Sequence, residues 1–446
     1  MEKSQRNPGK KIRIVASEVL PSGEIIELVY KPEYNTTQLA VFKDEQIEYL
    51  SRLERPHEIL EPYSPTFHLI KKGVILFPSY AEEYGSDARL IGEIRSFIHR
   101  YLDVSLFFEE IASYYVLFTW GYDRFNELPY LRALGDYGSG KSRFLQVIGS
   151  LCYKPMFVGG ATTTSPIFRI IDGFGGTLIL DEADYRFSDT TADIIKIMNS
   201  GYQKGSPVLR SEGKGTFEIK SYEVFGPKII ATRRRFDDQA LESRFLIEEM
   251  DKKEIRDDIP INLPETFAEE ARALRNKLLM WRFKNLDHIG LRTSEVDRSL
   301  EPRLNQIIMP LLSIVGSEMA ARLREFVRSY NQELIADRGL SLEATIFHAL
   351  LECVGDGGDE PTVKQITEKC ILKEPDGKFV SRRVGEILRK RLKLILRSTN
   401  RGHVVSSLEN QKKIEILKRK FGIHDTPLPT VNVVNEVNIQ EDKKGN

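Results

Sequence analysis

This sequence of 446 residues contains few cysteines, two tryptophans and no excess of positive or negative charge. Its three cysteines, Cys152, Cys353 and Cys370, form no C-x-x-C pair and no other metal-ligand spacing, so neither a disulfide framework nor a zinc site is expected. Thiols used this sparingly fit a reducing compartment, and we expect a cytoplasmic protein with buried or unused thiols. The seven histidines do not cluster, so they predict no further metal site.

Long apolar segments are also missing. No uninterrupted apolar run reaches about 18 residues, and no apolar stretch follows the polar N-terminus, so we expect neither a membrane span nor a secretion signal. Lysine and arginine total 65, as do aspartate and glutamate, which makes the formal net charge zero. Any contact with nucleic acid must therefore come from local basic surfaces. The remaining composition is ordinary for a globular chain of about two to four domains.

Residues 131–151 carry the most informative pattern. A short apolar strand is followed by a glycine-rich turn and an amphipathic helix in the G-x-x-x-x-G-K-[ST] spacing. Glycines let backbone N–H groups meet a phosphate at the positive end of the helix, so an ordinary strand-turn-helix is the weaker interpretation. We expect Lys141 to reach the β- and γ-phosphates of ATP and Ser142 to bind Mg²⁺. The expected nucleotide contacts are Gly135, Gly138, Ser139, Gly140, Lys141, Ser142 and Asp181.

A second apolar run, residues 176–180, is followed by Asp181 and Glu182. Such a run is typical of a buried parallel strand, which would bring both carboxylates to the edge of the sheet beside the phosphate loop. We predict that Asp181 binds Mg²⁺ and that Glu182 is the general base that activates water. The letters Asp-Glu-Ala-Asp do not indicate a DEAD-box RNA helicase, because the downstream residues do not supply a second RecA-like domain.

Residues 208–220 have the pattern of a β-hairpin whose glycine-bracketed tip carries Lys214. We expect Lys214 to contact a phosphodiester backbone in a central pore, with a solvated loop lysine as the alternative. The next strand ends in Thr232, whose hydroxyl we expect to orient the attacking water. Arg233 to Arg235 are expected at the surface. Arg244 is expected to reach the γ-phosphate bound by a neighbouring copy, with an ordinary surface salt bridge as the alternative.

The order of these signals resembles the AAA+ superfamily: phosphate loop, acidic strand, polar sensor strand and Ser-Arg-Phe arginine. The resemblance covers residues 131–314. The hairpin before the sensor strand is similar to the branch that contains minichromosome-maintenance helicases and the replication ATPases of phages, plasmids and integrated elements. It implies an ATPase that works as a DNA helicase. Thr232 stands where such proteins usually have asparagine, and no primase motif is present.

Helical periodicity returns at residues 265–283 and 302–332, with breaks at Gly290 and Pro310. These segments suit the helical lid of such an ATPase. Arg303 begins one lid helix, and the resemblance implies that it is a second sensor arginine that touches the nucleotide.

The two ends of the chain differ from this core. Residues 1–81 alternate strand-like runs with turns, with one helix expected at residues 44–55 and a hairpin across residues 66–77. An accessory or oligomerisation domain is the expectation here, and a nucleic-acid collar the alternative. Residues 342–406 predict three helices and a hairpin that resemble a winged-helix domain. DNA contacts are expected there from Arg382, Arg383, Arg389, Lys390, Arg391 and Arg401, although such domains also serve as protein-binding modules.

Together these signals predict an α/β fold: an AAA+ parallel sheet core with an α-helical lid, a small β-rich N-terminal domain and a C-terminal winged-helix domain. The expected boundaries are an accessory domain at 1–85, a helical connection at 86–128, the ATPase core at 129–255, the lid at 256–338, the winged helix at 339–422 and a flexible tail at 423–446. We expect an ATP-hydrolysing DNA motor of hexameric type, most simply a replicative helicase of a mobile element, phage or plasmid.

The expected partners are further copies of the chain and DNA, single-stranded in the pore and duplex or forked at the winged helix, with no membrane. Two other classes stay open: an AAA+ DNA-binding initiator or regulator that uses ATP as a switch, and a protein-remodelling AAA+ ATPase. Translocation polarity, ring size, host, DNA sequence preference and the need for a primase or loader do not follow from the sequence.

Overall fold

The computed structural model describes residues 10–423 except 182–188, 213–217, 237, 251–254, 293, 295, 340–341, 356–359 and 375–378. The chain divides into two compact units, Met1–Glu325 and Phe326–Asn446. Within the described ranges, no helix is both long enough and apolar enough to cross a bilayer. The predicted tail lies outside these ranges, and the predicted domain boundaries stay predictions.

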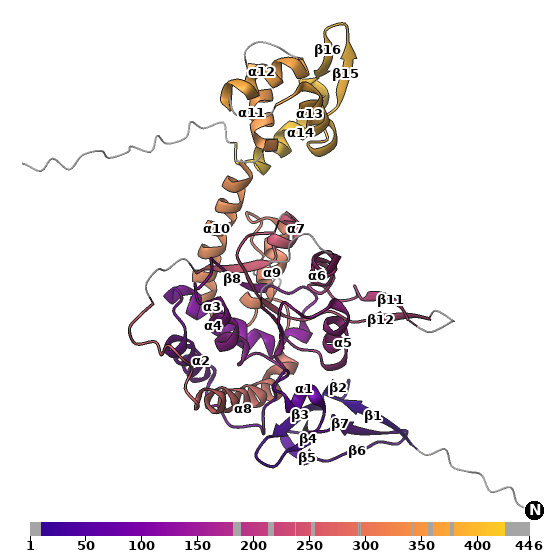
Figure 1. The fold of residues 1–446 in the computed structure, drawn as a ribbon, viewed down its shortest axis with the longest axis vertical. Coiled ribbons are helices and arrows are strands. Elements are labelled where there is room, and N and C mark those ends of the chain that lie inside the picture. Colours follow the sequence, from indigo (N-terminus) through magenta and orange to yellow (C-terminus); the bar gives the residue numbers. More distant parts are fainter. Residues whose placement is uncertain are drawn as a thin grey trace, which may run out of the picture. The chain divides into compact units, whose positions relative to one another are not determined.

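A five-stranded parallel sheet forms the centre of the first unit (Figure 1). Its strands are β8 (Tyr130–Leu134), β9 (Met156–Val158), β10 (Leu178–Leu180), β13 (Lys228–Thr232) and β14 (Phe245–Glu249). They lie in the order β14-β8-β13-β10-β9, and every neighbouring pair is parallel. The predicted α/β class is confirmed. Because all strands run in one direction, all their carboxyl ends meet at one edge.

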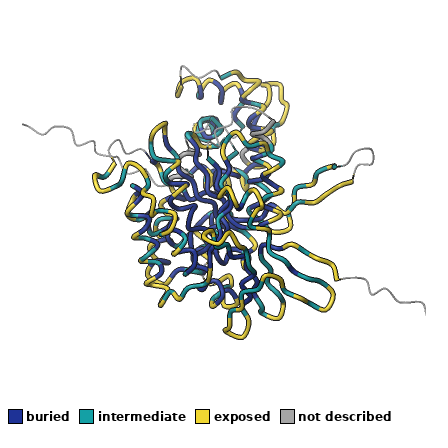
Figure 2. The backbone as a smooth tube through the Cα atoms, turned by 60° about the horizontal axis from the view of Figure 1, so that its bottom comes forward, coloured by how far each residue is buried: buried dark blue, intermediate teal, exposed yellow. Residues whose placement is uncertain are grey.

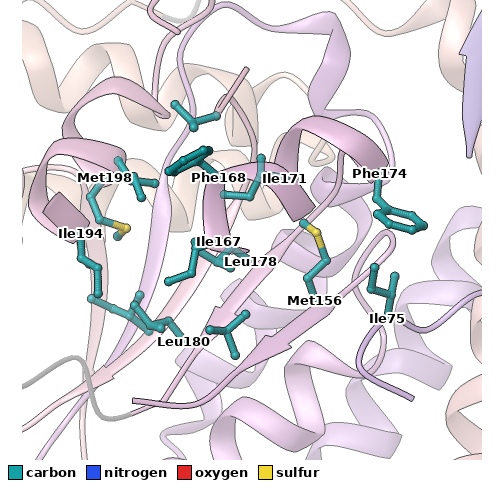
Figure 3. Close-up of a cluster of buried hydrophobic side chains, with 14 of the residues drawn as sticks. Ile75, Met156, Ile167, Phe168, Ile171, Phe174, Leu178, Leu180, Ile194 and Met198 are labelled. Carbon is teal, nitrogen blue, oxygen red and sulfur yellow. The ribbon is translucent and has the colours of Figure 1, made fainter. Parts of the chain in front are cut away.

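Helices cover both faces of this sheet. On one face, α5 (Thr164–Phe174) and α6 (Asp189–Ser200) pack on Leu178 and Leu180 of β10 in the apolar cluster drawn in Figure 3. On the other face, Ile179 lies against α4 (Lys141–Gly149) at Gly149. Side chains alternate between the faces of a strand, so an all-apolar run is what a strand buried on both sides requires. In Figure 2 this sheet is the buried centre of the first unit.

Two further helices, α2 (Asp87–Tyr101) and α3 (Leu106–Thr119), pack on each other and on α4. Ser86 and Ser105 cap them, each accepting a bond from a first-turn N–H group. The predicted helical connection is therefore part of the layer that carries the phosphate-loop helix.

The N-terminal segment folds into two small sheets, β2-β3-β4-β5 and β1-β7-β6. Their strands are β1 (Lys11–Val15), β2 (Ser17–Val19), β3 (Ile25–Lys31), β4 (Thr36–Lys43), β5 (Gln46–Leu50), β6 (Leu53–Glu54) and β7 (Glu58–Pro62). The helix predicted at residues 44–55 is wrong. Asp44 and Glu45 both have positive φ and form a two-residue hairpin turn without the usual glycine. The hairpin predicted at residues 66–77 is also wrong, because α1 (His68–Lys71) lies there.

Buried charges join the N-terminal sheet to α8 (Phe267–Asn285), the first helix of the predicted lid. Arg282 donates to Glu27 of β3 at 2.8 Å and to the Asp123 carboxylate at 2.7 Å. Glu27 also accepts from Tyr153, which lies before β9. Because buried charges are stable only when paired, these contacts hold α8 firmly against the body of the unit.

The other predicted lid segment forms α9 (Pro302–Leu312) and α10 (Ser317–Gly339). Helix α9 continues through Pro310 and ends two residues later, so the predicted break lies slightly downstream. Its residues pack on α3.

The second unit contains α11 (Leu342–Gly355), α12 (Val363–Lys373), α13 (Ser381–Glu386), a π-helical turn (Ile387–Arg391), β15 (Leu396–Thr399) and β16 (Gly402–Val405). Three helices followed by an antiparallel hairpin is the predicted order. A final helix, α14 (Ser407–Lys420), was not predicted; its apolar residues Ile414 and Leu417 complete the core of this unit.

Candidate active site

The loop between β8 and α4 turns at two glycines. Gly138 and Gly140 have φ of +74° and +90°, where L residues are strained, and Gly140 is the N-cap of α4. A Cβ at Gly135 would lie 2.8 Å from Ser139 Oγ and 2.9 Å from the Met250 carbonyl oxygen. In the described residues no side chain caps α4, so its first N–H groups are open to an anion.

Ser142 and Asp181 lie next to each other at this loop. Ser142 Oγ, in the first turn of α4, donates to Asp181 Oδ2, directly after β10, at 2.9 Å. Lys141 Nζ donates to the carbonyls of Gly135 at 2.7 Å and Asp136 at 2.5 Å. A hydroxyl and a carboxylate this close suit Mg²⁺, which takes few protein oxygens and completes its shell with water and phosphates.

Thr232 ends β13, the strand that lies between β8 and β10. Its side chain is 1% exposed, and its Oγ1 has no hydrogen-bond partner among the described residues. The Thr232 carbonyl accepts from the N–H of Gly135, so the hydroxyl lies close to the start of the phosphate loop. An unpaired buried hydroxyl costs about 1–3 kcal/mol and calls for an explanation. Glu182, the predicted general base, lies outside the described residues.

The phosphate loop opens onto a cavity of 340 Å³. Lys141, Ser142 and Asp181 line it together with Tyr137 and Arg233. Arg233 was expected at the surface, but its guanidinium carbon lies 3.5 Å from the centroid of the Tyr137 ring. Three consecutive arginines gave no signal for which one faces the cavity, except that Arg233 follows Thr232 directly.

A second cavity, of 410 Å³, adjoins the same loop and shares Ser139, Gly140 and Arg143 with the first. Its walls are the end of α2, the start of α4, the end of β14 and residues 255–261. Arg143 holds them together by donating to the carbonyls of Pro260 at 3.1 Å and Ile261 at 2.6 Å. The apolar lining suits a flat aromatic base. It consists of Leu102, Met250, Ile255, Ile259, Pro260 and Ile261.

Sequence reasoning missed this cavity because its walls come from three regions that are distant in the chain: residues 101–103, 139–143, and 248–250 with 255–261. Residues 86–128 were interpreted as packing helices, whereas Tyr101 and Leu102 at the end of α2 form one wall. A motif search cannot find a surface that tertiary packing assembles.

Arg244 lies at the opposite end of the sheet. It directly precedes β14, whose Phe245 pairs with Tyr130 at the start of β8, so a strand roughly 16 Å long separates it from the phosphate loop. Arg244 is 5% exposed, donates to the Asn199 side chain, and lies 3.9 Å from the centroid of the Tyr202 ring. Its Nε has no hydrogen-bond partner among the described residues.

Arg303 lies beside Arg244 rather than beside the phosphate loop. Its Nη1 donates to the Ala240 carbonyl at 3.1 Å, and it belongs to the lining of neither cavity. Burial and the charge of Arg303 lower the pKa of Arg244. Both arginines are therefore distant from the two cavities at the loop of their own chain, and their roles stay predictions.

The predicted hairpin consists of β11 (Val208–Glu212) and β12 (Glu218–Tyr222), which pair antiparallel and project from the body of the unit (Figure 1). Its tip, including Lys214, lies outside the described residues. Glu212 pairs with Arg169 of α5, and the Tyr222 ring packs at a tilt against Phe168. The base of the hairpin is thus fixed on the layer that covers β10.

The second unit has a groove of 380 Å³ of its own. It is lined by Arg382 of α13, by Arg389 and Lys390 of the π-helical turn, and by His403 of β16. Lys390 pairs with Glu386 at 2.5 Å, which leaves the groove with a net positive charge. We call it the basic groove.

Three other predicted DNA contacts lie outside this groove. Arg383 and Arg401 are exposed, and Arg391 pairs with Glu343 of α11. The sequence analysis did not single out His403, because it has no histidine or acidic neighbour in the sequence. The turn between β15 and β16 could have indicated that His403 lies near the basic residues.

No protein-family model and no curated protein matches the chain. Among solved structures, the NrS-1 C-terminal region (305–718) aligns over 85% of this chain and 96% of its own, with 10% identity and a TM-score of 0.37. The active helicase Cch of SCCmec type IV aligns over 92% and 82%, with 12% identity and a TM-score of 0.45. JCV helicase aligns over 61% and 67%, with 16% identity and a TM-score of 0.23. Since these TM-scores are below 0.5, function must be inferred from the site itself.

Proposed function

We propose that the chain is an ATP-hydrolysing DNA motor of the AAA+ type, most simply a replicative helicase of a mobile element, phage or plasmid that works as a hexameric ring. One observation carries the proposal. Lys141 begins the helix that follows β8, Asp181 directly follows β10, and Thr232 ends β13, so all three lie at one edge of the sheet. Lys141 and Asp181 line a cavity there. In open α/β sheets this edge is where ligands bind.

Within this site each residue has a chemical role that its position supports. Lys141 would turn from the loop carbonyls to the phosphates, and the aromatic base would occupy the larger cavity. Bound Mg²⁺ would supply positive charge to the phosphates, held by Ser142 and Asp181. Glu182 would take a proton from the attacking water, which the Thr232 hydroxyl orients.

The positions of Arg244 and Arg303 favour a site shared between copies. Neither reaches the cavities of its own chain, so we propose that both act on the nucleotide of a neighbouring copy. Arg244 would then have to leave Asn199 and Tyr202 when the copies assemble. Its unpaired Nε is consistent with a guanidinium that is incompletely satisfied inside its own chain.

Strand β13 supplies a mechanical link from the nucleotide to the hairpin. At its carboxyl end is Thr232, and at its amino end Lys228 donates to the carbonyls of Gly201, Val224 and Gly226 at 3.2, 3.0 and 2.9 Å. Those carbonyls belong to the segments that enter and leave the hairpin. A displacement of β13 during hydrolysis would thereby reach the hairpin, whose Lys214 we propose contacts single-stranded DNA in the pore.

The test measures three properties of the full chain: mass in solution, ATP hydrolysis with and without single-stranded DNA, and strand displacement from a forked duplex. We expect a ring, stimulation by DNA and displacement, and Asp181→Asn should lower hydrolysis by about 100-fold or more, as expected from the loss of a residue that stabilises transition-state charge. Asp44→Asn is the control, since this exposed turn residue has positive φ that asparagine accepts. A monomer that hydrolyses ATP at the same rate with and without DNA would contradict the proposal of a DNA motor.

The basic groove favours a second candidate, an initiator or regulator that binds duplex DNA and uses ATP as a switch. The two candidates differ in what the hairpin does. Lys214→Ala should keep ATP hydrolysis and lose unwinding if the chain is a motor. A wild-type chain that binds duplex and hydrolyses ATP but displaces no strand would favour the switch. Stimulation by a partner protein instead of DNA would favour a protein-remodelling ATPase.

A further inference from the structure

Arg233 lines the cavity of 340 Å³ at the loop and has been given no role in the proposed function. Among the described residues, the cavity is lined by three cations, Lys141, Arg143 and Arg233, and by one carboxylate, Asp181. Arg143 directs its guanidinium to the carbonyls of Pro260 and Ile261 in the wall of the larger cavity. Lys141 is assigned by the loop motif to the β- and γ-phosphates. The remaining cation lies where a further negative charge on the nucleotide would be placed.

The backbone of Arg233 is held by the sheet. Thr232, the preceding residue, is paired with Leu134 of β8, and its carbonyl accepts from Gly135 of the loop. The Arg233 side chain therefore starts from a fixed point beside the loop. It then reaches over Tyr137, a loop residue that is 77% exposed.

We infer that Arg233 binds the terminal phosphate of a nucleoside triphosphate held by the same chain, leaves the Tyr137 ring when it does so, and thereby distinguishes triphosphate from diphosphate. This inference rests on the proposed ATPase function. A cation–π contact at an exposed tyrosine is weak, whereas guanidinium and phosphate form charge-assisted, often bidentate hydrogen bonds. A planar fork of donors is also the group best matched to phosphate oxygens.

The same position would let Arg233 report the nucleotide state to the hairpin. Arg233 follows β13 directly, and Lys228 at the other end of β13 holds both ends of the hairpin segment. Arg233 differs in this from Arg244, which lies at the amino end of β14 and needs a neighbouring copy. The effect of Arg233 should therefore persist at protein concentrations where the chain is a monomer.

The experiment compares the affinities of ADP and of a non-hydrolysable ATP analogue, both with Mg²⁺, for the full chain. Wild type should prefer the triphosphate. Arg233→Ala should weaken binding of the analogue about 10-fold or more and leave ADP affinity nearly unchanged, as expected for the loss of charged hydrogen bonds. Arg233→Lys should recover part of the preference, because it keeps the charge without the fork. Arg234→Ala, at the exposed neighbouring arginine, is the matched control and should behave as wild type.

A tryptophan at position 137 gives an independent readout. In Tyr137→Trp, fluorescence should change when the triphosphate analogue binds and stay constant when ADP binds, and the added Arg233→Ala should abolish the difference. Thermal melting establishes that each variant is folded.

The outcomes separate the two levels of the proposal. If wild type binds no nucleotide, the ATPase function fails and the inference with it. If wild type binds both nucleotides, but Arg233→Ala weakens the binding of both equally or keeps the preference for the triphosphate analogue, the proposed role of Arg233 is wrong. The proposed ATPase function is then unaffected.

Discussion

At the carboxyl end of the parallel sheet charged side chains line cavities, whereas at its amino end they are packed inside the chain. Lys141 and Asp181 belong to the first group and face a cavity of 340 Å³. Arg244 belongs to the second and is covered by Asn199 and Tyr202. The contrast is between one end whose charges face open cavities and another whose charge is held by side chains of its own chain.

One strand connects the two ends. Arg132, fully buried in the middle of β8, pairs with Glu242, two residues before Arg244. The Phe236 N–H also donates to Glu242, so the turn that carries Arg244 is held from both sides. The other end of β8 leads directly into the phosphate loop. Movement of the loop therefore has a short path, along β8 and across the Arg132–Glu242 ion pair, to the arginine that we propose acts on the neighbouring copy.

Lys141→Ala should have the largest effect, because it removes the cation of the carboxyl end that meets the phosphates. We expect ATP hydrolysis to fall to the background rate, by more than about 10³-fold, because the preorganised charge that meets the phosphates is lost. Steady-state hydrolysis measures this, and Lys196→Ala is the control, since that exposed lysine pairs with Asp193 on its own helix. If Lys141→Ala hydrolyses ATP at the wild-type rate, the active site does not include Lys141.

Mixing chains that carry Lys141→Ala with chains that carry Arg244→Ala tests whether residues of two copies form one active site. Arg244→Ala alone should lose about 10³-fold or more in hydrolysis where an arginine finger acts in trans. Rings assembled from Lys141→Ala and Arg244→Ala chains should recover part of the activity that each lacks alone, because some seams then join an intact loop to an intact arginine. Hydrolysis at several mixing ratios is the measurement, and no recovery at any ratio argues against shared sites.

Thr232→Val should separate activity from stability at the carboxyl end. The change replaces an unpaired buried hydroxyl with a methyl group of similar volume, so thermal stability should be unchanged or higher. The turnover number should nevertheless fall about 10-fold, with little change in KM, because the hydroxyl that orients the attacking water is lost. Thr232→Ser should restore turnover. Equal loss in both variants would indicate a packing role.

Lys228 offers the smallest and most specific test, since it anchors the hairpin on β13. Burial lowers the pKa of Lys228 to about 7 from 10.5. Between these values the unfolded chain binds more protons than the folded chain, so this residue makes stability rise as pH increases. Lys228→Met should be less stable throughout, and its melting temperature should fall further behind wild type from pH 7 to pH 9, by about 2 °C. A constant gap would mean that the three carbonyls keep the lysine charged.

Local patterns predicted most of the central sheet and the phosphate loop. Apolar runs marked β8, β10 and β13, because strands buried on both faces are rich in apolar residues. The buried polar residues in them, Arg132, Lys228 and Thr232, are exceptions to this pattern. The N-terminal errors came from a turn at Asp44 and Glu45 that lacks glycine, so the strand after it was read as a helix. Arg233 was missed because three arginines in succession are equivalent in sequence until the strand end directs one of them to the cavity.

The α/β class and the glycine-rich turn between β8 and α4 followed from the sequence by itself, because glycine conformation and helix N-termini are properties of a few consecutive residues. The tertiary structure decided which distant residues share a cavity. It brought Arg233 beside Lys141 and Asp181, and it left Arg244 and Arg303 at the other end. The physical reason is that a parallel sheet groups residues by the strand end they occupy, whatever their separation along the chain.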